Sequence, residues 1–268
     1  KHEINEILNV NDEFGPYSIL EYIGKGSSAQ IYHVVDNIKD VNYILKLFNH
    51  EENQESALHE YNIINSLSDH PNIPRLGGNL SNMRFFSDRE YDDRYYLYYD
   101  YITGYNLQEY YEKLSKFDIN TFEKVFKKLA EIISYVHSKN IIHGDIKPAN
   151  IILNIDTFEP YLVDYKTANN PGIYSIRGTT RYIPIDHLKS CQIIFDKKLD
   201  IYSYGITAFE LLTGDHPYLD NINTFISNDS EAIFAQKCKK YSKEISAECF
   251  DLIRRCISVG ASDRFETF

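Results

Sequence analysis

Alternating apolar and polar residues fill much of the first hundred positions of the chain. The stretch YSILEYIGKGSSAQIYHVVD at 17–36 alternates on both sides of a glycine-rich turn, and 42–48 and 94–102 repeat the pattern. A period of two residues is typical of β-strands, so these stretches predict a sheet that opens with a hairpin. One helix is expected within this region, because 55–67 carries apolar residues at helical spacing and Pro71 follows it.

The apolar period changes after Gly104. Between Phe122 and Val136 the apolar residues recur on one helical face, and Asp118 offers a polar N-cap at the start of this long helix. A loop is expected at 166–190. Two short strands are expected around 150–153 and 161–164. Three further helices are expected at 199–214, 229–241 and 246–258.

This order of elements predicts an α+β fold with a change of lobe near 103–106. We divide the chain into an N-terminal extension at 1–16, a sheet-rich lobe at 17–102 and a helical lobe at 103–268.

Composition narrows the class of protein. The chain has 268 residues with 43% hydrophobic content, enough for one large domain or two smaller lobes. Its net charge of -11 argues against a nucleic-acid-binding surface as its main function. No apolar run approaches the roughly 18 residues that a membrane helix needs. The four cysteines lack the spacing of a zinc site and are expected to be buried thiols in a reducing compartment.

The octet HGDIKPAN at 143–150 gathers chemically active groups after the long helix. Asp145 can accept a hydroxyl proton, and Lys147 can neutralise negative charge on a phosphoryl group. Asn150 and Asp164, which follows the strand-like YLV, offer hard oxygen ligands for Mg²⁺. Together these groups indicate phosphoryl transfer.

The first lobe carries the complementary groups. Gly24 and Gly26 lie between two strands, where backbone amides can approach a phosphate closely, although an ordinary hairpin turn also requires glycines. Lys46 stands in the middle of an apolar strand, so its ammonium group must either reach solvent or meet an anion. Glu60, 14 residues further on in the predicted helix, is a fitting partner for it.

These motifs, in this order from about Tyr17 to Arg264, resemble the protein kinase superfamily. The Gly-rich loop is similar to IGKGSSAQI, the strand-three lysine motif to YILK, the catalytic loop to HGDIKPAN and the metal-binding motif to VDYK. The segments GTTRYIPID, DIYSYG and LIRRCISVGASDR resemble the end of an activation segment, the start of helix αF and the family's last stretch. The chain stops four residues after Arg264, so the family's final helix is expected to be missing.

The resemblance implies a two-lobed protein kinase fold that uses ATP with Mg²⁺, or Mn²⁺ in its place, and phosphorylates Ser or Thr of protein substrates. Asp145 and Lys147 would be catalytic, and Asn150 and Asp164 would hold the metal. The nucleotide-binding residues would be Ile23, Gly24, Gly26, Ile31, Ile44, Lys46, Glu60, Asp100, Tyr101, Ile102 and Ile152.

The resemblance also implies several supporting roles. Tyr99 falls at the gatekeeper position of the nucleotide pocket. Asp200 would accept hydrogen bonds from backbone amides of the catalytic loop, and His143 would pack against Tyr165 and Ile64. Asp186 and Arg264 would form a structural ion pair.

Several positions depart from the family pattern. Gly144 replaces the arginine that normally clamps a phosphorylated activation loop, so activity is expected to be independent of loop phosphorylation. Lys166 replaces a glycine and Ala29 replaces the third glycine of the nucleotide loop, which restricts the backbone. Ile44 and Tyr99 are expected to narrow the adenine pocket and to reduce ATP affinity.

Two alternatives remain open on sequence grounds. One is a pseudokinase that binds partners with weak or no phosphoryl transfer. The other is a small-molecule phosphotransferase of the aminoglycoside or choline kinase type, which shares the triplet HGD. For any of them the expected location is the cytoplasm, or a host cytosol if the protein is a delivered effector. The sequence leaves the oligomeric state open.

Overall fold

The computed structural model describes residues 7–26, 28–49, 54–78, 94–114, 118–190, 192–218 and 230–268. The chain divides into two units, Lys1–Ile102 and Thr103–Phe268. Cys191, one of the four cysteines, lies outside the described residues. No helix among the described residues is long and apolar enough to cross a membrane.

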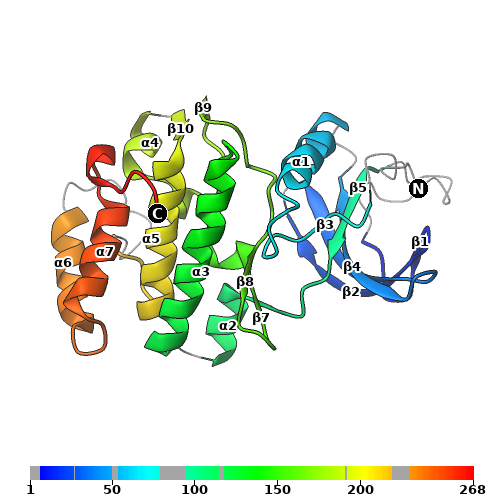
Figure 1. Ribbon diagram of the computed structural model, residues 1–268, viewed down its shortest axis with the longest axis horizontal. Coiled ribbons are helices and arrows are strands. Elements are labelled where there is room, and N and C mark those ends of the chain that lie inside the picture. The colour runs from blue at the N-terminus through cyan, green and yellow to red at the C-terminus, as the bar shows by residue number, and fades with distance from the viewer. Residues whose placement is uncertain are drawn as a thin grey trace. The chain divides into compact units, whose positions relative to one another are not determined.

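A five-stranded antiparallel sheet forms the first unit (Figure 1). Its strands follow one another in sequence order: β1 (Glu13–Phe14), β2 (Tyr17–Lys25), β3 (Ala29–Asp36), β4 (Val41–Phe48) and β5 (Tyr96–Asp100). The predicted hairpin is confirmed, because β2 pairs with β3 in antiparallel register. The sheet begins earlier than expected, at Glu13, because Gly15 takes a φ of 58° and turns the chain so that Phe14 pairs with Tyr17.

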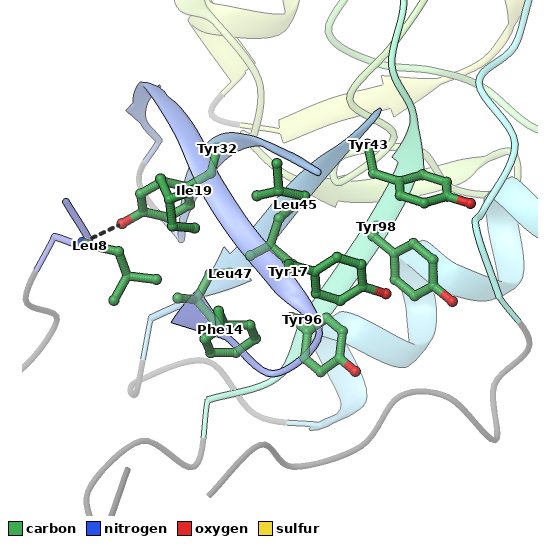
Figure 2. Packing of buried hydrophobic residues seen from close by; sticks show 11 residues of the cluster. Leu8, Phe14, Tyr17, Ile19, Tyr32, Tyr43, Leu45, Leu47, Tyr96 and Tyr98 are labelled. Atoms are coloured by element: carbon green, nitrogen blue, oxygen red, sulfur yellow. Dashed lines mark hydrogen bonds between the residues drawn. The ribbon is translucent and has the colours of Figure 1, made fainter. Parts of the chain in front are cut away.

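An aromatic cluster covers one face of this sheet (Figure 2). It joins alternate residues of β2 to β5 with Leu8 and Phe14 from the segment before β2. The backbone N–H of Leu8 donates to the hydroxyl group of Tyr32 at 3.1 Å, which fixes this segment to the sheet. Residues assigned to an N-terminal extension on sequence grounds therefore contribute to the core of the first unit.

Helix α1 (Gln54–Ser66) covers the opposite face of the sheet, as Figure 1 shows. Ala57 and Tyr61 of this helix pack with Phe48 of β4 and Leu97 of β5. Because side chains alternate along a strand, the residues of β4 on this face include Ile44 and Lys46 as well as Phe48. The helix therefore lies where its polar side chains can reach the centre of the sheet.

Helices form most of the second unit, where α3, α5 and α7 run side by side (Figure 1). The helices are α2 (Leu107–Leu114), α3 (Ile119–Ser138), α4 (Ile185–Ser190), α5 (Lys197–Thr213), α6 (Ser230–Tyr241) and α7 (Ala247–Ile257). The long helix predicted from its apolar face is α3, and Asp118 caps it as expected. Helix α5 is buried along most of its length and starts two residues earlier than predicted, because Asp196 caps its first turn.

Two small sheets complete the second unit. One has the order β6-β7-β8, with strands β6 (Gly104–Asn106), β7 (Ile151–Asn154) and β8 (Pro160–Leu162). The other pairs β9 (Gly172–Ser175) with β10 (Gln192–Phe195). The sequence predicted only a loop over the first of these two strands. That expectation was wrong because the partner of β9 lies 20 residues further along the chain, beyond the reach of local periodicity.

Candidate active site

The lysine in the middle of β4 forms a buried ion pair in the first unit. Lys46 Nζ donates to Glu60 Oε1 at 2.8 Å and to Oε2 at 2.9 Å. Lys46 is 6% exposed and Glu60 is 1% exposed, so water does not screen the two charges. The partner proposed from sequence for this lysine is therefore the observed one.

A tyrosine joins this ion pair from the neighbouring strand. Tyr99 on β5 lies directly opposite Ile44 on β4, and its hydroxyl group donates to Glu60 Oε1 at 3.0 Å. The sequence identified Tyr99 only as a bulky gatekeeper and did not anticipate this hydrogen bond. The sequence does contain a sign of this bond. Tyr99 carries a hydroxyl group and lies near the end of a strand that pairs with the strand of Lys46.

The other nucleotide-binding candidates of the first unit lie on strands next to Lys46. Ile31 is opposite Gly24 on one side and Lys46 on the other. Ile23 directly precedes Gly24 on β2, and Gly26 follows the end of that strand. Ile23 is half-exposed. The structure thus brings the hairpin residues and Lys46 onto neighbouring strands.

The three candidates that close the first unit follow one another directly. Asp100 is the last residue of β5, and Tyr101 and Ile102 follow it. The ring of Tyr101 stacks on that of His33, with centroids 4.0 Å apart and planes within 3°. The remaining candidate, Ile152, belongs to the second unit, on β7 opposite Asn106 and Tyr161.

Packing does not explain the glycines of the hairpin. A Cβ atom built on Gly24 would have no described atom within 4 Å, and one on Gly26 would meet only the carbonyl oxygen of Ala29, at 3.7 Å. Neither glycine has the positive φ that would exclude other residues. As far as the described residues go, the space beside these glycines is therefore open, as a phosphate-binding loop requires.

In the second unit, three donors surround the carboxylate of Asp145. Lys147 Nζ donates to its Oδ2 at 2.8 Å, Asn150 Nδ2 to the same oxygen at 3.1 Å, and the backbone N–H of Thr179 to Oδ1 at 2.8 Å. Lys147 Nζ also donates to Thr179 Oγ1 at 2.6 Å. Asp145 is 8% exposed, so the three donors hold an almost enclosed carboxylate in one orientation.

Asp200 of α5 positions the loop that carries Asp145. Its two carboxylate oxygens accept from the backbone N–H groups of His143, at 2.9 Å, and Gly144, at 2.8 Å, as expected from the sequence. Nε2 of His137 lies 2.8 Å from the same carboxylate. Burial alone would raise the pKa of Asp200, but the hydrogen bond and the charge of His137 bring that pKa below its ordinary value.

The glycine of the HGD triplet has a structural cause. Gly144 has a φ of 76°, and a Cβ atom there would lie 2.6 Å from the ring of Phe195 on β10. The guanidinium group of Arg177 lies 5.3 Å from the centroid of the same ring and 4.3 Å from that of Tyr174. Aromatic and cationic groups of the segment around β9 and β10 therefore pack beside Gly144.

Asn150 and Asp164 are the candidate metal ligands. Asn150 Nδ2 is held by the carbonyl oxygen of Asp145 at 2.8 Å as well as by its carboxylate, so the amide oxygen Oδ1 is the end left for another partner. Asp164 is exposed and has a φ of 61°. The described residues contain no cluster of three His, Cys, Asp or Glu side chains that could hold a metal ion. A metal bound here would need phosphate oxygens or water to complete its coordination.

Two structural contacts expected from sequence are confirmed. The His143 and Tyr165 rings meet edge to face at 4.9 Å, and Arg264 Nη2 lies 3.2 Å from Asp186 Oδ1. The hydroxyl group of Tyr165 is buried and has no hydrogen-bond partner among the described residues. Burial raises the pKa of this hydroxyl group far above its ordinary value.

Sequence reasoning missed the pairing of Arg181 with Glu210. Arg181 lies in the short turn that follows Thr179, whose N–H donates to Asp145. Arg181 Nε donates to Glu210 Oε1 at 2.6 Å, and the hydroxyl group of Tyr182 donates to Oε2 at 2.7 Å. It also did not anticipate the bonds of Thr179 to Asp145 and Lys147. The partners in these bonds lie 28 or more residues apart along the chain, and no local motif indicates them.

Comparison with known proteins gives consistent matches. The family model for the protein kinase domain matches residues 17–267. The chain is 28% identical over 271 residues to calcium-dependent protein kinase 5 of Plasmodium berghei, covering 97% of this chain and 46% of that protein. It is 28% identical over 265 residues to an Aurora kinase of Yarrowia lipolytica, covering 96% and 67%. It is also 26% identical over 262 residues to the serine/threonine-protein kinase PrkC of Bacillus subtilis, covering 94% and 39%.

The chain thus spans less than half the length of two of these three relatives. A solved structure, that of the Cydia pomonella granulovirus kinase PK-1, matches with a TM-score of 0.71 and 19% identity. The match covers 94% of this chain and 91% of that one. Together with the five-stranded sheet of the first unit and the helices of the second, this match confirms the predicted α+β kinase fold.

Proposed function

The chain belongs to the protein kinase domain family, and from this premise we propose that it transfers the γ-phosphate of ATP to Ser or Thr hydroxyl groups of proteins. The first unit would be the N-lobe of this kinase and the second unit its C-lobe. The names of the relatives support the choice of Ser/Thr, since one of them is a serine/threonine-protein kinase. Lys147 points the same way, because it resembles the Ser/Thr-specific form of the catalytic loop.

The observation that carries the proposal is the arrangement around Asp145. A carboxylate fixed by Lys147, Asn150 and Thr179 can accept the proton of an acceptor hydroxyl group as its oxygen attacks the γ-phosphorus. The ammonium group of Lys147, 2.8 Å from Asp145, can stabilise negative charge that develops on the phosphoryl group. A structural loop would not need a carboxylate, an amide and an ammonium group so close together.

The first unit supplies groups suited to holding the nucleotide. Lys46, oriented by Glu60, presents a cation to phosphate oxygens, and the open space beside Gly24 leaves room for them. The side chains of Ile31 and Ile44 are suited to contact adenine. Tyr99 opposite Ile44 would restrict this space, so we expect ATP to bind more weakly than it would beside a smaller residue.

The donor set of Asn150 and Asp164 fits Mg²⁺, which prefers oxygen ligands and keeps several water or phosphate ligands of its own. Mg²⁺, or Mn²⁺ in its place, would supply positive charge to the phosphate oxygens when bound. The chain's own contribution is to fix Asn150 through its amide nitrogen so that its oxygen is presented.

We also propose that the kinase is a non-RD variant, active without phosphorylation of its activation segment. Gly144 leaves no guanidinium group to clamp a phosphate, and the ring of Phe195 fills the space beside it. Arg177 instead stacks on Tyr174 and Phe195, which links β9 and β10 without a phosphate.

A cytosolic location agrees with this activity, which needs a supply of ATP. Cys238, Cys249 and Cys256 are free thiols, which agrees with a reducing compartment, but only Cys256 is buried as the sequence predicted.

Transfer of label from γ-labelled ATP, in the presence of Mg²⁺ or Mn²⁺, to a mixture of Ser- and Thr-containing proteins tests the proposed activity. Replacing the base in Asp145→Asn should lower the rate by about 10²- to 10⁴-fold. Asp251→Asn, which changes an exposed aspartate on α7 in the same way, should leave the rate unchanged. Nucleotide binding without transfer would favour a pseudokinase, and label in choline or an aminoglycoside alone would favour a small-molecule phosphotransferase.

Treatment of the purified protein with a phosphatase tests the independence from loop phosphorylation. Treated and untreated protein should phosphorylate a substrate at the same initial rate. Arg177→Gln should lower that rate in both samples, because it removes the stack on Tyr174 and Phe195. A large loss of rate after phosphatase treatment alone would contradict this part of the proposal.

A further inference from the structure

The backbone next to the catalytic base leads directly to an exposed arginine. Thr179 N–H donates to Asp145 Oδ1 at 2.8 Å, and Thr180–Tyr182 form a short 3₁₀ turn immediately after it. The hydroxyl group that loses its proton must lie within hydrogen-bond reach of Asp145. The residues that flank this hydroxyl group in a bound peptide therefore pass close to the 3₁₀ turn.

The arginine of this turn is held in a fixed orientation. Arg181 Nε donates to Glu210 Oε1 at 2.6 Å, and Nε2 of His216 lies 3.1 Å from the carbonyl oxygen of Arg181. The Arg181 side chain is nevertheless 48% exposed. The bond to Glu210 uses Nε, and the hydroxyl group of Tyr182 also lies beside the guanidinium group. The two terminal amino groups, Nη1 and Nη2, bond to no carboxylate within the described part of the chain. They form the edge of a guanidinium group that can bind a carboxylate or phosphate with two parallel hydrogen bonds.

The acid beside this arginine is not presented to solvent in the same way. The Glu210 side chain is 13% exposed, and its oxygens already accept from Arg181 and from the Tyr182 hydroxyl group. A basic side chain of a peptide would have to compete with Arg181 for this carboxylate. In the pair of Arg181 and Glu210, the arginine is therefore the charge that faces the solvent.

The segment around Arg181 is basic, like Arg181 itself. The whole chain has 28 basic and 39 acidic residues, but 166–190 has four basic residues and one acidic residue, Asp186. Asp186 is engaged by Arg264 at 3.2 Å. The segment that leads to and from the base is thus a basic stretch of an acidic protein, and such a stretch attracts acidic partners.

From these contacts we infer that Arg181 selects acceptor peptides that carry an acidic or phosphorylated side chain within a few residues of the target hydroxyl group. This inference rests on the proposed kinase activity and names its substrate class. Arg181 selects by charge and geometry, while Asp145 performs proton transfer for every acceptor.

Matched peptides test the inference. Each contains one Ser in a neutral background and places Glu, Lys or Ala at one of the three positions before or after it. For the wild-type chain, we expect kcat/KM at the best position to be about tenfold higher with Glu than with Lys, mostly through KM. The difference should shrink as salt is added, because the contact is exposed. A preference for Lys, or none at any position, overturns the inference.

Three variants separate Arg181 from other charges. Arg181→Gln removes the cation and frees the Glu210 carboxylate, so the preference should shift from Glu to Lys. The double variant with Arg181→Gln and Glu210→Gln should show no preference. Arg254→Gln, which changes another exposed and paired arginine, should keep the wild-type preference. An unchanged preference for Glu in Arg181→Gln overturns the role of Arg181. If that variant does not fold, the wild-type peptide series still tests the preference for acidic peptides.

Phosphorylation of protein substrates in the same assay separates the proposed kinase activity from the proposed preference for acidic peptides. If proteins are phosphorylated but acidic peptides have no advantage, the kinase activity stands and the inference is wrong. If the wild-type chain phosphorylates neither proteins nor peptides, the proposed function is wrong and the inference falls with it.

Discussion

Two tyrosines of the second unit have hydroxyl groups in opposite situations. The hydroxyl group of Tyr165 is buried without a hydrogen-bond partner among the described residues, whereas that of Tyr182 donates to Glu210 at 2.7 Å. Burying an unsatisfied hydroxyl group costs about 1–3 kcal/mol. Removing the oxygen in Tyr165→Phe should therefore raise the free energy of unfolding by about 1 kcal/mol, as measured by urea denaturation.

Tyr182→Phe is the matched control for this substitution. It also removes one oxygen, but it breaks a hydrogen bond to a carboxylate, so the free energy of unfolding should fall by about 1 kcal/mol. A loss of stability in both variants would show that the Tyr165 hydroxyl group has a partner after all.

Gly144 and Gly24 also differ in a way that substitution can test. Gly144→Ala forces a Cβ atom to within 2.6 Å of the Phe195 ring at a φ of 76°, and this strain should lower the free energy of unfolding by at least about 1 kcal/mol. Gly24→Ala places its Cβ atom in open space and should leave stability unchanged while raising KM for ATP. Thermal unfolding and steady-state kinetics measure the two effects, and equal loss of stability would contradict the structural argument.

Residue types alone indicated most of the chemistry. A lysine within an apolar strand requires an anion, and Glu60 is the anion that the structure provides. The hydrogen bond from the Tyr99 hydroxyl group to Glu60 and the pairing of Arg181 with Glu210 were not predicted. Tyrosine and arginine are common on protein surfaces, so their presence gives no sign of a specific partner.

At the scale of elements, helix α5 depends on its first turn. Asp196 is its N-cap, and its carboxylate accepts from the backbone N–H of Leu199 at 3.2 Å. Asp196→Ala removes this side-chain acceptor and leaves the Leu199 N–H only the backbone carbonyl oxygen of residue 196, at 3.1 Å, so it should lower the free energy of unfolding by about 1 kcal/mol. Asp196→Ser keeps an oxygen acceptor and should recover most of that loss in the same urea titration. Equal loss in both variants would mean that the cap is not the cause.

The same scale shows where periodicity succeeds and where it fails. Helix α3 presents one apolar face at regular spacing, and its predicted extent agrees with the structure. Strands β9 and β10 are four residues each and are stabilised by their mutual pairing. Short strands whose partner is distant leave little trace in a local window of sequence.

At the scale of the whole molecule, stability should depend on pH through His216. Its Nδ1 accepts from the backbone N–H of Tyr218 and its Nε2 donates to the Arg181 carbonyl oxygen, an arrangement that fits the neutral ring. Burial, together with the charges of Arg181 and Lys237, lowers the pKa of His216 to about 3. The unfolded chain takes up this proton below about pH 6.5, but the folded chain resists it until about pH 3.

Acid should therefore favour the unfolded state. Between pH 7 and pH 5 the wild-type chain should lose up to about 2 kcal/mol of its free energy of unfolding through this group. His216→Gln should lose less over the same interval, whatever its stability at pH 7. Urea titrations at pH 7, 6 and 5 measure the difference, and identical slopes for the two proteins would contradict the assignment to His216.

The sequence by itself determined the α+β class, the hairpin that opens the sheet, the long amphipathic helix and the groups able to perform phosphoryl transfer. These properties follow from residue type and short-range spacing, which a local reading captures. Only the tertiary structure decided that Thr179 touches Asp145, that Tyr99 joins the Lys46–Glu60 ion pair and that Arg181 covers Glu210. Each of these contacts joins residues 29 or more positions apart, and which distant partner a side chain meets is determined by how the elements pack.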